Sequence, residues 1–256
     1  TWALVRELVE DMSVFDTFLY GDDFHNLKAA IKQVYLNKVI ADIYTHGTID
    51  PKVIYDAVKI HDFTLLPEYM RACAEEAYQI QMRSGDSQLC DIIIDRAALE
   101  SIYQKGKKSG NDLLADYVEL KVVAANINIA VRGYHTGKNI EFFERAFADC
   151  SSLNRKSLIE VSLSGKKEIY DYLSTTAYAD AVPALEESTS AFERWCDNRI
   201  IKLIQPQKYN SFTVSPLAAY ILARENEIKS VRILLSGKRN FLPENSIRER
   251  LREMYV

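Results

Sequence analysis

The stretch SPLAAYILARENEIKSVRILLSGKRNFLPENSIRERLREMYV, residues 215–256, decides how the rest of this sequence is interpreted. Ser215 is a suitable N-cap, and Pro216 fits the first helical position, where its missing N–H would have no partner. Apolar residues then recur at helical spacing as far as Leu235, and Gly237 can close the helix in a left-handed turn. These features predict one long helix.

A second helix is predicted to end the chain, opened by Pro243. Its apolar residues are spaced i, i+4 and i+7, a pattern that lines one helical face. They are Ile247, Leu251 and Met254. Arg248 and Arg252 lie one turn apart and off that face, so we predict that both are exposed and available to a partner.

The motif in the long helix occurs twice more upstream, each time 100 residues earlier. The matched sets are Asn26, Ile31, Lys32, Asn37, Lys38; Asn126, Val131, Arg132, Gly137, Lys138; and Asn226, Val231, Arg232, Gly237, Lys238. An internal repeat of this length predicts three copies of one helical unit. We place the units at residues 1–64, 65–164 and 165–256. The first is shorter than the second, so we expect further sequence before Thr1.

The repeated residues have a physical interpretation on a helix. Positions one, four, five and eight after the asparagine share one face, which is apolar in the first two copies, while Glu227 departs from the pattern in the third. Asparagine is unfavourable inside a helix unless its amide has a partner, so we predict hydrogen bonds from Asn26, Asn126 and Asn226 to neighbouring main chain. The basic residue at position six lies on the opposite side. It is either a solvated residue or part of a binding surface, as in Arg132 and Arg232.

Composition supports an all-α fold. The chain has 256 residues, 48% of them hydrophobic and 27% charged, and only nine glycines and six prolines interrupt it, as expected for long helices. The net charge of −4 argues against a nucleic-acid-binding protein. Residues 199–256, however, carry 11 Lys and Arg against 5 Asp and Glu. This basic end could face an acidic partner or an anionic membrane surface. Alternatively, its charges are ordinary solvent-exposed residues on helix surfaces.

The sequence offers little chemistry. Its four cysteines, Cys73, Cys90, Cys150 and Cys196, form no paired motif and are interpreted as reduced core residues. His25 follows Asp22 at metal-ligand spacing, but no second such pair or His/Cys cluster accompanies it. The segment 133–139, GYHTGKN, departs from a phosphate-binding loop in spacing and lies at a predicted helix C-terminus, which repels anions. We therefore predict no catalytic residue, no cofactor and no metal. No apolar run is long enough to span a bilayer.

The C-terminal stretch resembles the end of the C subunits of the V/A-type rotary ATPases, the family that includes the AC39 protein of the vacuolar enzyme. The residues that carry the resemblance are Pro216–Leu217, Ala223–Glu227, Val231–Arg232, Ser236–Lys238 and Ile247–Val256.

The resemblance implies three similar helical subdomains around an open centre, shaped like a funnel. It implies a non-catalytic protein present in a single copy, in which the open mouth of the funnel holds the rotor stalk subunits D and F. Its base would rest on the proteolipid ring at the cytoplasmic face of the membrane. Such a protein would transmit torque for ATP-coupled H⁺ or Na⁺ transport. On the basis of this resemblance, we take the candidate partner interface to comprise Arg132, Arg232, Arg248 and Arg252. The alternative hypothesis is an all-α enzyme with an unrecognised carboxylate-metal site.

Overall fold

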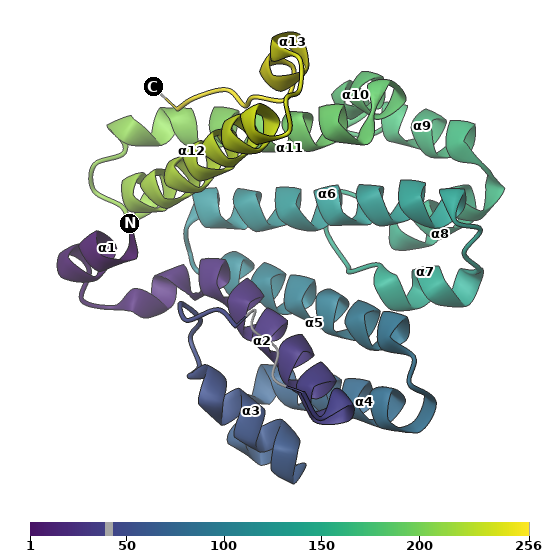
Figure 1. Cartoon of the computed structure of the whole chain (residues 1–256). Coiled ribbons are helices and arrows are strands. Elements are labelled where there is room, and N and C mark those ends of the chain that lie inside the picture. Colours follow the sequence, from purple (N-terminus) through teal and green to yellow (C-terminus); the bar gives the residue numbers. More distant parts are fainter. Residues whose placement is uncertain (39–42, 256) are drawn as a thin grey trace.

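The computed structural model describes residues 1–38 and 43–255, and within those ranges it contains helices and no strand (Figure 1). The predicted all-α fold is confirmed. Short 3₁₀ turns join several helices: η1 (Met12–Phe15), η2 (Phe63–Leu65), η3 (Ala179–Ala181) and η4 (Gln205–Tyr209).

The first five helices form the lower part of the molecule in Figure 1, drawn in purple and blue. They are α1 (Trp2–Leu8), α2 (Asp16–Leu36), α3 (Pro51–Ile60), α4 (Glu68–Ser84) and α5 (Ser87–Lys107). Local signals set their ends. The Asp50 side chain accepts a hydrogen bond from Lys52 N and caps α3. Gly85, at φ 67°, ends α4 in a left-handed turn. The next residue, Asp86, is the N-cap of α5, and its side chain accepts a hydrogen bond from Leu89 N.

The remaining helices are α6 (Asp112–His135), α7 (Ile140–Ala146), α8 (Arg155–Ser164), α9 (Lys166–Ser174), α10 (Val182–Glu187), α11 (Thr189–Ile204), α12 (Ser215–Arg239) and α13 (Glu244–Arg248). Most of them form the upper part of Figure 1, while α7 lies lower, beside α5. Side chains of Asn111, Asn139, Asn154 and Ser188 cap α6, α7, α8 and α11. Ser215 is the first residue of α12 and not its N-cap, and its hydroxyl instead accepts a hydrogen bond from Asn111.

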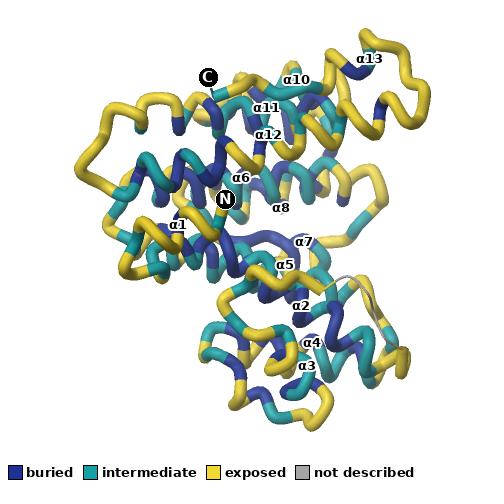
Figure 2. Tube along the Cα trace, turned by 60° about the vertical axis from the view of Figure 1, so that its left-hand side comes forward, coloured by how far each residue is buried: buried dark blue, intermediate teal, exposed yellow. Residues whose placement is uncertain are grey.

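The apolar core consists of two clusters that share α6. Figure 2 shows in dark blue where buried residues lie along the chain. Leu114 and Val118, in the first half of α6, join the cluster built from α2–α5 and from the junction of α11 and α12. Val123 and Ile127, further along α6, join the cluster of α7–α11. The three predicted units, 1–64, 65–164 and 165–256, therefore remain a proposal, since α6 and α11 contribute to both clusters.

The three repeated asparagines make the same kind of contact. Asn26, Asn126 and Asn226 are 3%, 2% and 6% exposed, and each side-chain amide donates a 2.8 Å hydrogen bond to a main-chain carbonyl. The acceptors are Tyr44, Ala148 and Glu253, which lie 18, 22 and 27 residues further along the chain. Each helix thus holds the segment that returns after it, and this shared contact supports the three-unit proposal.

The contact is complete in two of the three positions. Tyr44 N and Ala148 N each donate back to the asparagine Oδ1, at 2.9 and 3.1 Å, so that both amide groups are satisfied. Asn226 Oδ1 is buried with no hydrogen-bond partner among the described residues. The third contact is therefore the weakest of the three.

The predicted helix ends are right in two cases and wrong in the third. Asn37 and Gly137 adopt left-handed φ values of 50° and 62°, as expected. Gly237 does not, because α12 continues to Arg239 and Phe241 takes the left-handed turn, with φ 55°. Gly237 is needed for another reason. A Cβ there would lie 2.6 Å from Ile247 Cγ1, so the glycine allows α13 to approach α12.

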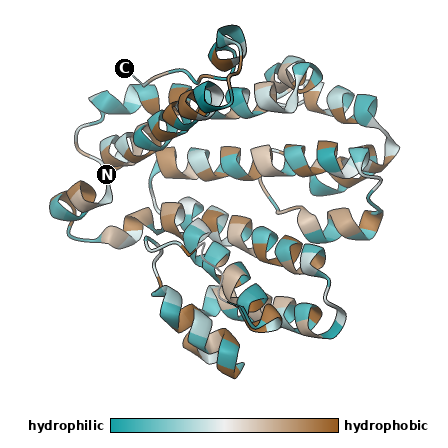
Figure 3. Ribbon diagram, viewed as in Figure 1, coloured by the Kyte–Doolittle hydropathy of each residue, from teal (hydrophilic) through white to brown (hydrophobic). Residues whose placement is uncertain are grey.

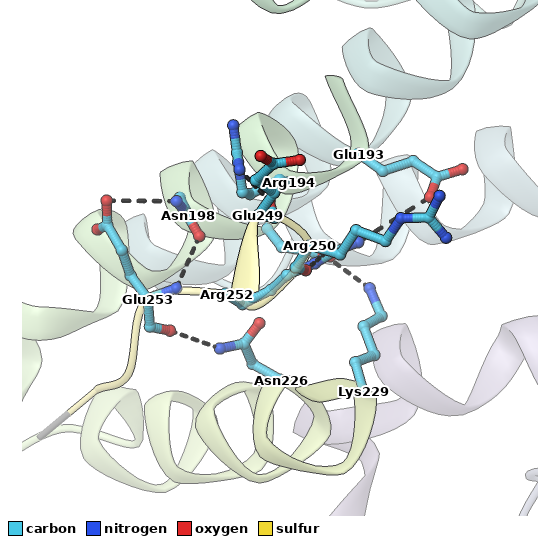
Figure 4. Close-up of polar contacts among 10 residues, drawn as sticks. Glu193, Arg194, Asn198, Asn226, Lys229, Glu249, Arg250, Arg252 and Glu253 are labelled. Carbon is cyan, nitrogen blue, oxygen red and sulfur yellow. Dashed lines mark hydrogen bonds and ion pairs between the residues drawn. The ribbon is translucent and has the colours of Figure 1, made fainter. Parts of the chain in front are cut away.

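The predicted C-terminal helix is much shorter than expected. The α13 helix ends at Arg248, and the following segment, residues 249–255, is not helical. Ile247 is buried as predicted, but Leu251 is only partly buried and Met254 is 46% exposed. The reason is that the main chain of this segment bonds to other helices. Glu253 N donates to Asn198 Oδ1 at 2.9 Å, and Glu253 O accepts from Asn226 (Figure 4).

Replacement of the second asparagine tests these contacts. We expect Asn126→Ala to lower the free energy of unfolding by roughly 2–4 kcal/mol, because it leaves the buried N–H and C=O of Ala148 without partners. Asn226→Ala is the matched control and should cost about half as much, since one hydrogen bond is lost there. Urea denaturation measures the free energy of unfolding of both variants. An equal loss of stability in the two would contradict the difference between two hydrogen bonds at Asn126 and one at Asn226.

Glu119 of α6 joins three elements. Its carboxylate accepts hydrogen bonds from Tyr103 OH of α5 at 2.9 Å and from Ser152 N and Oγ before α8, and it pairs with Lys107 at 2.8 Å. Burial alone would raise the pKa of Glu119, but the hydrogen bonds from Lys107 and Ser152 outweigh it and lower the pKa to about 2.

This lowered pKa predicts a pH dependence of stability. A carboxylate with a depressed folded-state pKa stabilises the fold fully above its unfolded pKa, and that stability is lost as the pH falls through the folded value. Glu119→Gln should therefore cost on the order of 2–3 kcal/mol at pH 7, and this difference should shrink as the pH falls from 4.5 toward 2. Urea denaturation of both proteins across that range checks it, and a pH-independent difference would refute the assignment.

Candidate interaction surface

The four candidate interface arginines occupy different environments. Arg132, near the end of α6, and Arg232, in the second half of α12, are exposed and form no ion pair with any described residue. Arg248 of α13 is 71% exposed and pairs with Glu244, 2.6 Å away. Arg252 is the only one of the four whose side chain is buried. The structure thus brings Arg232 and Arg252 to one groove and leaves Arg132 and Arg248 outside it.

The prediction that Arg252 is exposed is wrong. Its side chain is 7% exposed, and its Nε lies 2.8 Å from Oδ2 of Asp197, whose side chain is itself 10% exposed. The physical reason is the non-helical course of residues 249–255, which turns this side chain toward α11. Lys229 Nζ lies 2.6 Å from the other Asp197 oxygen, so one buried carboxylate holds two cations from α12 and the C-terminal segment.

A groove of 510 Å³ lies between α6, α11 and α12. Small side chains of α6 line one side, Ala124 and Ala125, and the other side carries Lys229 and Arg232 of α12. A second hollow of 260 Å³ shares Ala124 with it and reaches Tyr117, Lys121 and Glu225. The groove therefore combines small residues that admit another element with charged residues that could orient it.

Burial and neighbouring groups shift the pKa of residues that line the groove and the adjoining hollow. The Tyr117 hydroxyl is the main group that raises the pKa of Lys121. Burial lowers this pKa, and the Glu225 carboxylate raises it further. Burial raises the pKa of the Cys196 thiol to about 12, so this thiol is not a nucleophile at neutral pH. The arrangement suits recognition by charge and shape.

Cys73 and Cys90 are buried and Cys150 and Cys196 partly buried, and all four are free thiols. Among residues 1–38 and 43–255, no three His, Cys, Asp or Glu side chains are grouped to hold a metal ion. The part of the chain that the structure describes also contains no helix with the length and apolar character needed to cross a membrane.

Comparison with known proteins identifies the family. A family model described as the ATP synthase (C/AC39) subunit matches residues 1–250. The chain belongs to this C/AC39 family. Family membership makes it a non-catalytic subunit of a V- or A-type ATPase complex, and the hypothesis of an all-α enzyme is set aside.

Individual members of the C/AC39 family show the extent of the similarity. The C subunit of the V-type sodium ATPase of Enterococcus hirae is 25% identical over 237 residues, which cover 91% of this chain and 72% of that protein. The C subunit of the A-type ATP synthase of Halorubrum lacusprofundi is 23% identical, with the same coverage. Its counterpart in Halobacterium salinarum is 24% identical over 62% of this chain and 48% of its own length.

Sequence reasoning missed two features of this surface. Asp197, which holds Arg252 and Lys229, interrupts the apolar pattern of α11, and that interruption was an available signal. The repeat pattern places Val231 on the core-facing side of its helix, and this is wrong, because Val231 is 54% exposed, as are its neighbours Ile228 at 43% and Leu235 at 63%. Their exposure depends on the position of other helices, which periodicity does not report.

The two arginines of the groove should respond differently to substitution. We expect Arg252→Gln to destabilise the fold by about 2–3 kcal/mol, because it removes one of the two cations that neutralise buried Asp197. Arg232→Gln, in contrast, should change stability by no more than about half a kcal/mol, since this side chain is exposed. Thermal or urea unfolding of the two variants distinguishes them. Equal stability would show that the Arg252–Asp197 pair contributes little.

Proposed function

We propose that this chain is the rotor-linking component of a V/A-type ATPase. In this proposal it joins the tip of the central stalk, subunits D and F, to the proteolipid ring. It is present in one copy, lies at the cytoplasmic side of the membrane, and transmits torque for ATP-coupled H⁺ or Na⁺ transport. The family match over residues 1–250 is the observation that carries the proposal.

The physical design of the chain supports a mechanical role. Its long helices are tied together by buried amides at Asn26 and Asn126 and by the Glu119 carboxylate, contacts that make a rigid body. A linker that passes torque needs rigidity and complementary surfaces, and it needs no reactive group. The groove beside Arg232 and the exposed half of α12 are available as such surfaces.

The experiment is assembly of the ATPase with and without this chain. With it, stalk and ring should co-purify as one complex, and ATP hydrolysis should drive ion pumping. Without it, we expect hydrolysis by the soluble head and stalk to persist while pumping is lost, because rotation no longer reaches the ring. Failure of the chain to associate with both stalk and ring, or full pumping in its absence, would refute the proposed function.

A further inference from the structure

The second half of α12 extends beyond the core and carries an apolar stripe that the described chain leaves largely exposed. Figure 3 shows hydrophobic segments, in brown, along α12. Ile228, Val231 and Leu235 are 43%, 54% and 63% exposed. We call these three residues the α12 seam. They are spaced by three and four residues, as are the a and d positions of a coiled coil, and the next position of that pattern is Lys238. From Ile228 to Lys238 the seam spans about 15 Å, or nearly three helical turns.

The seam distinguishes α12 from the helices that carry the other two copies of the motif. Two residues after the repeated asparagine, α2 has Lys28 and α6 has Asn128, where α12 has Ile228. Five residues after it, Ile31 is fully buried and Val131 is partly buried, whereas Val231 is mostly exposed. At this fifth position the chain covers α2 fully and α6 in part. On α12 the face carries more apolar residues and has no cover among the described residues.

Cations border the seam. Arg232 and Arg239 lie seven residues apart along one edge, at the positions that set partner choice in coiled coils. Neither of them, nor Lys238, forms an ion pair within residues 1–38 and 43–255, whereas Arg224 and Glu227 nearby pair with each other. The unpaired charge at this edge is positive, so a complementary surface carries carboxylates.

We infer that the α12 seam binds an amphipathic helix of another protein, whose apolar stripe covers Ile228, Val231 and Leu235 and whose acidic residues pair with Arg232 and Arg239. This inference rests on the proposed function, and it specifies the chemistry of the segment that a neighbouring component of the complex presents. The small residues of the adjoining groove, Ala124 and Ala125, leave room for such a helix beside α12.

Two other occupants fit less well. In a dimer of this chain, parallel seams would place Lys238 against Lys238, and antiparallel seams would place Arg232 against Arg239, so like charges would meet in either case. Helices that bind at a membrane surface present a large apolar face with Trp, Phe or Leu. The three residues of the seam include no Trp or Phe. Leu234, 41% exposed, lies beside the seam and Phe241, 94% exposed, follows α12, so the vesicle measurement below is the arm that separates a membrane from a partner helix.

The test uses two synthetic peptides of three heptads. Both carry the same Ile and Leu seam, and they differ in having Glu or Lys at the flanking e and g positions. Fluorescence anisotropy with the full chain at low salt should show binding of the acidic peptide and little of the basic one. The affinity should fall as salt is added, because exposed charge pairs are screened.

Variants make the test specific to the seam. Arg232→Glu with Arg239→Glu should weaken binding of the acidic peptide by about tenfold or more and improve binding of the basic one, since attraction becomes repulsion. Leu235→Glu should abolish binding of both. The matched control is Lys202→Glu with Lys208→Glu, two exposed cations in α11 and η4 outside the seam, and it should bind like wild type. Thermal unfolding confirms that each variant is folded.

Several results would overturn the inference. Equal binding of both peptides, or binding that Leu235→Glu leaves intact, would remove the seam as the site. A Leu235-dependent dimer in ultracentrifugation would assign the seam to a second copy. Leu235-dependent binding to phosphatidylserine vesicles, with none to the acidic peptide, would assign it to a membrane.

Assembly separates the seam from the proposed function. If wild type and Leu235→Glu enter the ATPase complex equally well, the seam inference fails and the proposed function stands. If wild type selects the acidic peptide but associates with neither stalk nor ring, the proposed function fails and helix recognition stands.

Discussion

The hydrogen bond between a helical asparagine and a returning segment of main chain is the contact on which the arrangement of helices depends. A long helix buries one face against its neighbours, but it does not by itself fix where the following connection returns. At Asn26 and Asn126, one amide group satisfies both polar groups of a single main-chain residue, and at Ala148 these groups would otherwise be buried without partners. Each amide therefore ties a helix to the chain that follows it.

The third copy of this contact accounts for the unusual end of the chain. Asn226 holds Glu253 by one hydrogen bond, and Asn198 and Asp197 of α11 hold the same segment from the other side. The main chain there cannot also form helical hydrogen bonds, so α13 stops early and Arg252 turns inward. The early end of α13 and the buried Arg252–Asp197 ion pair are thus two results of one local arrangement.

The predictable part of the fold is the part that local patterns determine. Caps such as Asp50 and Asn154, the glycine at 137 and the apolar periodicity of α6 indicated the helices and most of their ends. The spacing of the asparagines indicated a repeated contact, although the segments they bind could not be named, because these lie 18 to 27 residues away. The candidate surface was harder to predict, because tertiary contacts decide it and neither periodicity nor capping signals contain them. Arg248 and Arg252 are equivalent on an ideal helix, but the helix ends between them, and one is exposed while the other neutralises Asp197.

The structure is a preformed scaffold with an open helical face at the second half of α12. Amide hydrogen exchange of the chain, alone and within the assembled ATPase, tests this claim most directly. We expect Tyr44 and Ala148, whose amides are held by asparagine side chains, to exchange slowly in the isolated chain and to change little on assembly. Assembly should slow exchange in residues 228–239. Rapid exchange throughout the isolated chain, or unchanged exchange in residues 228–239 after assembly, would contradict the account.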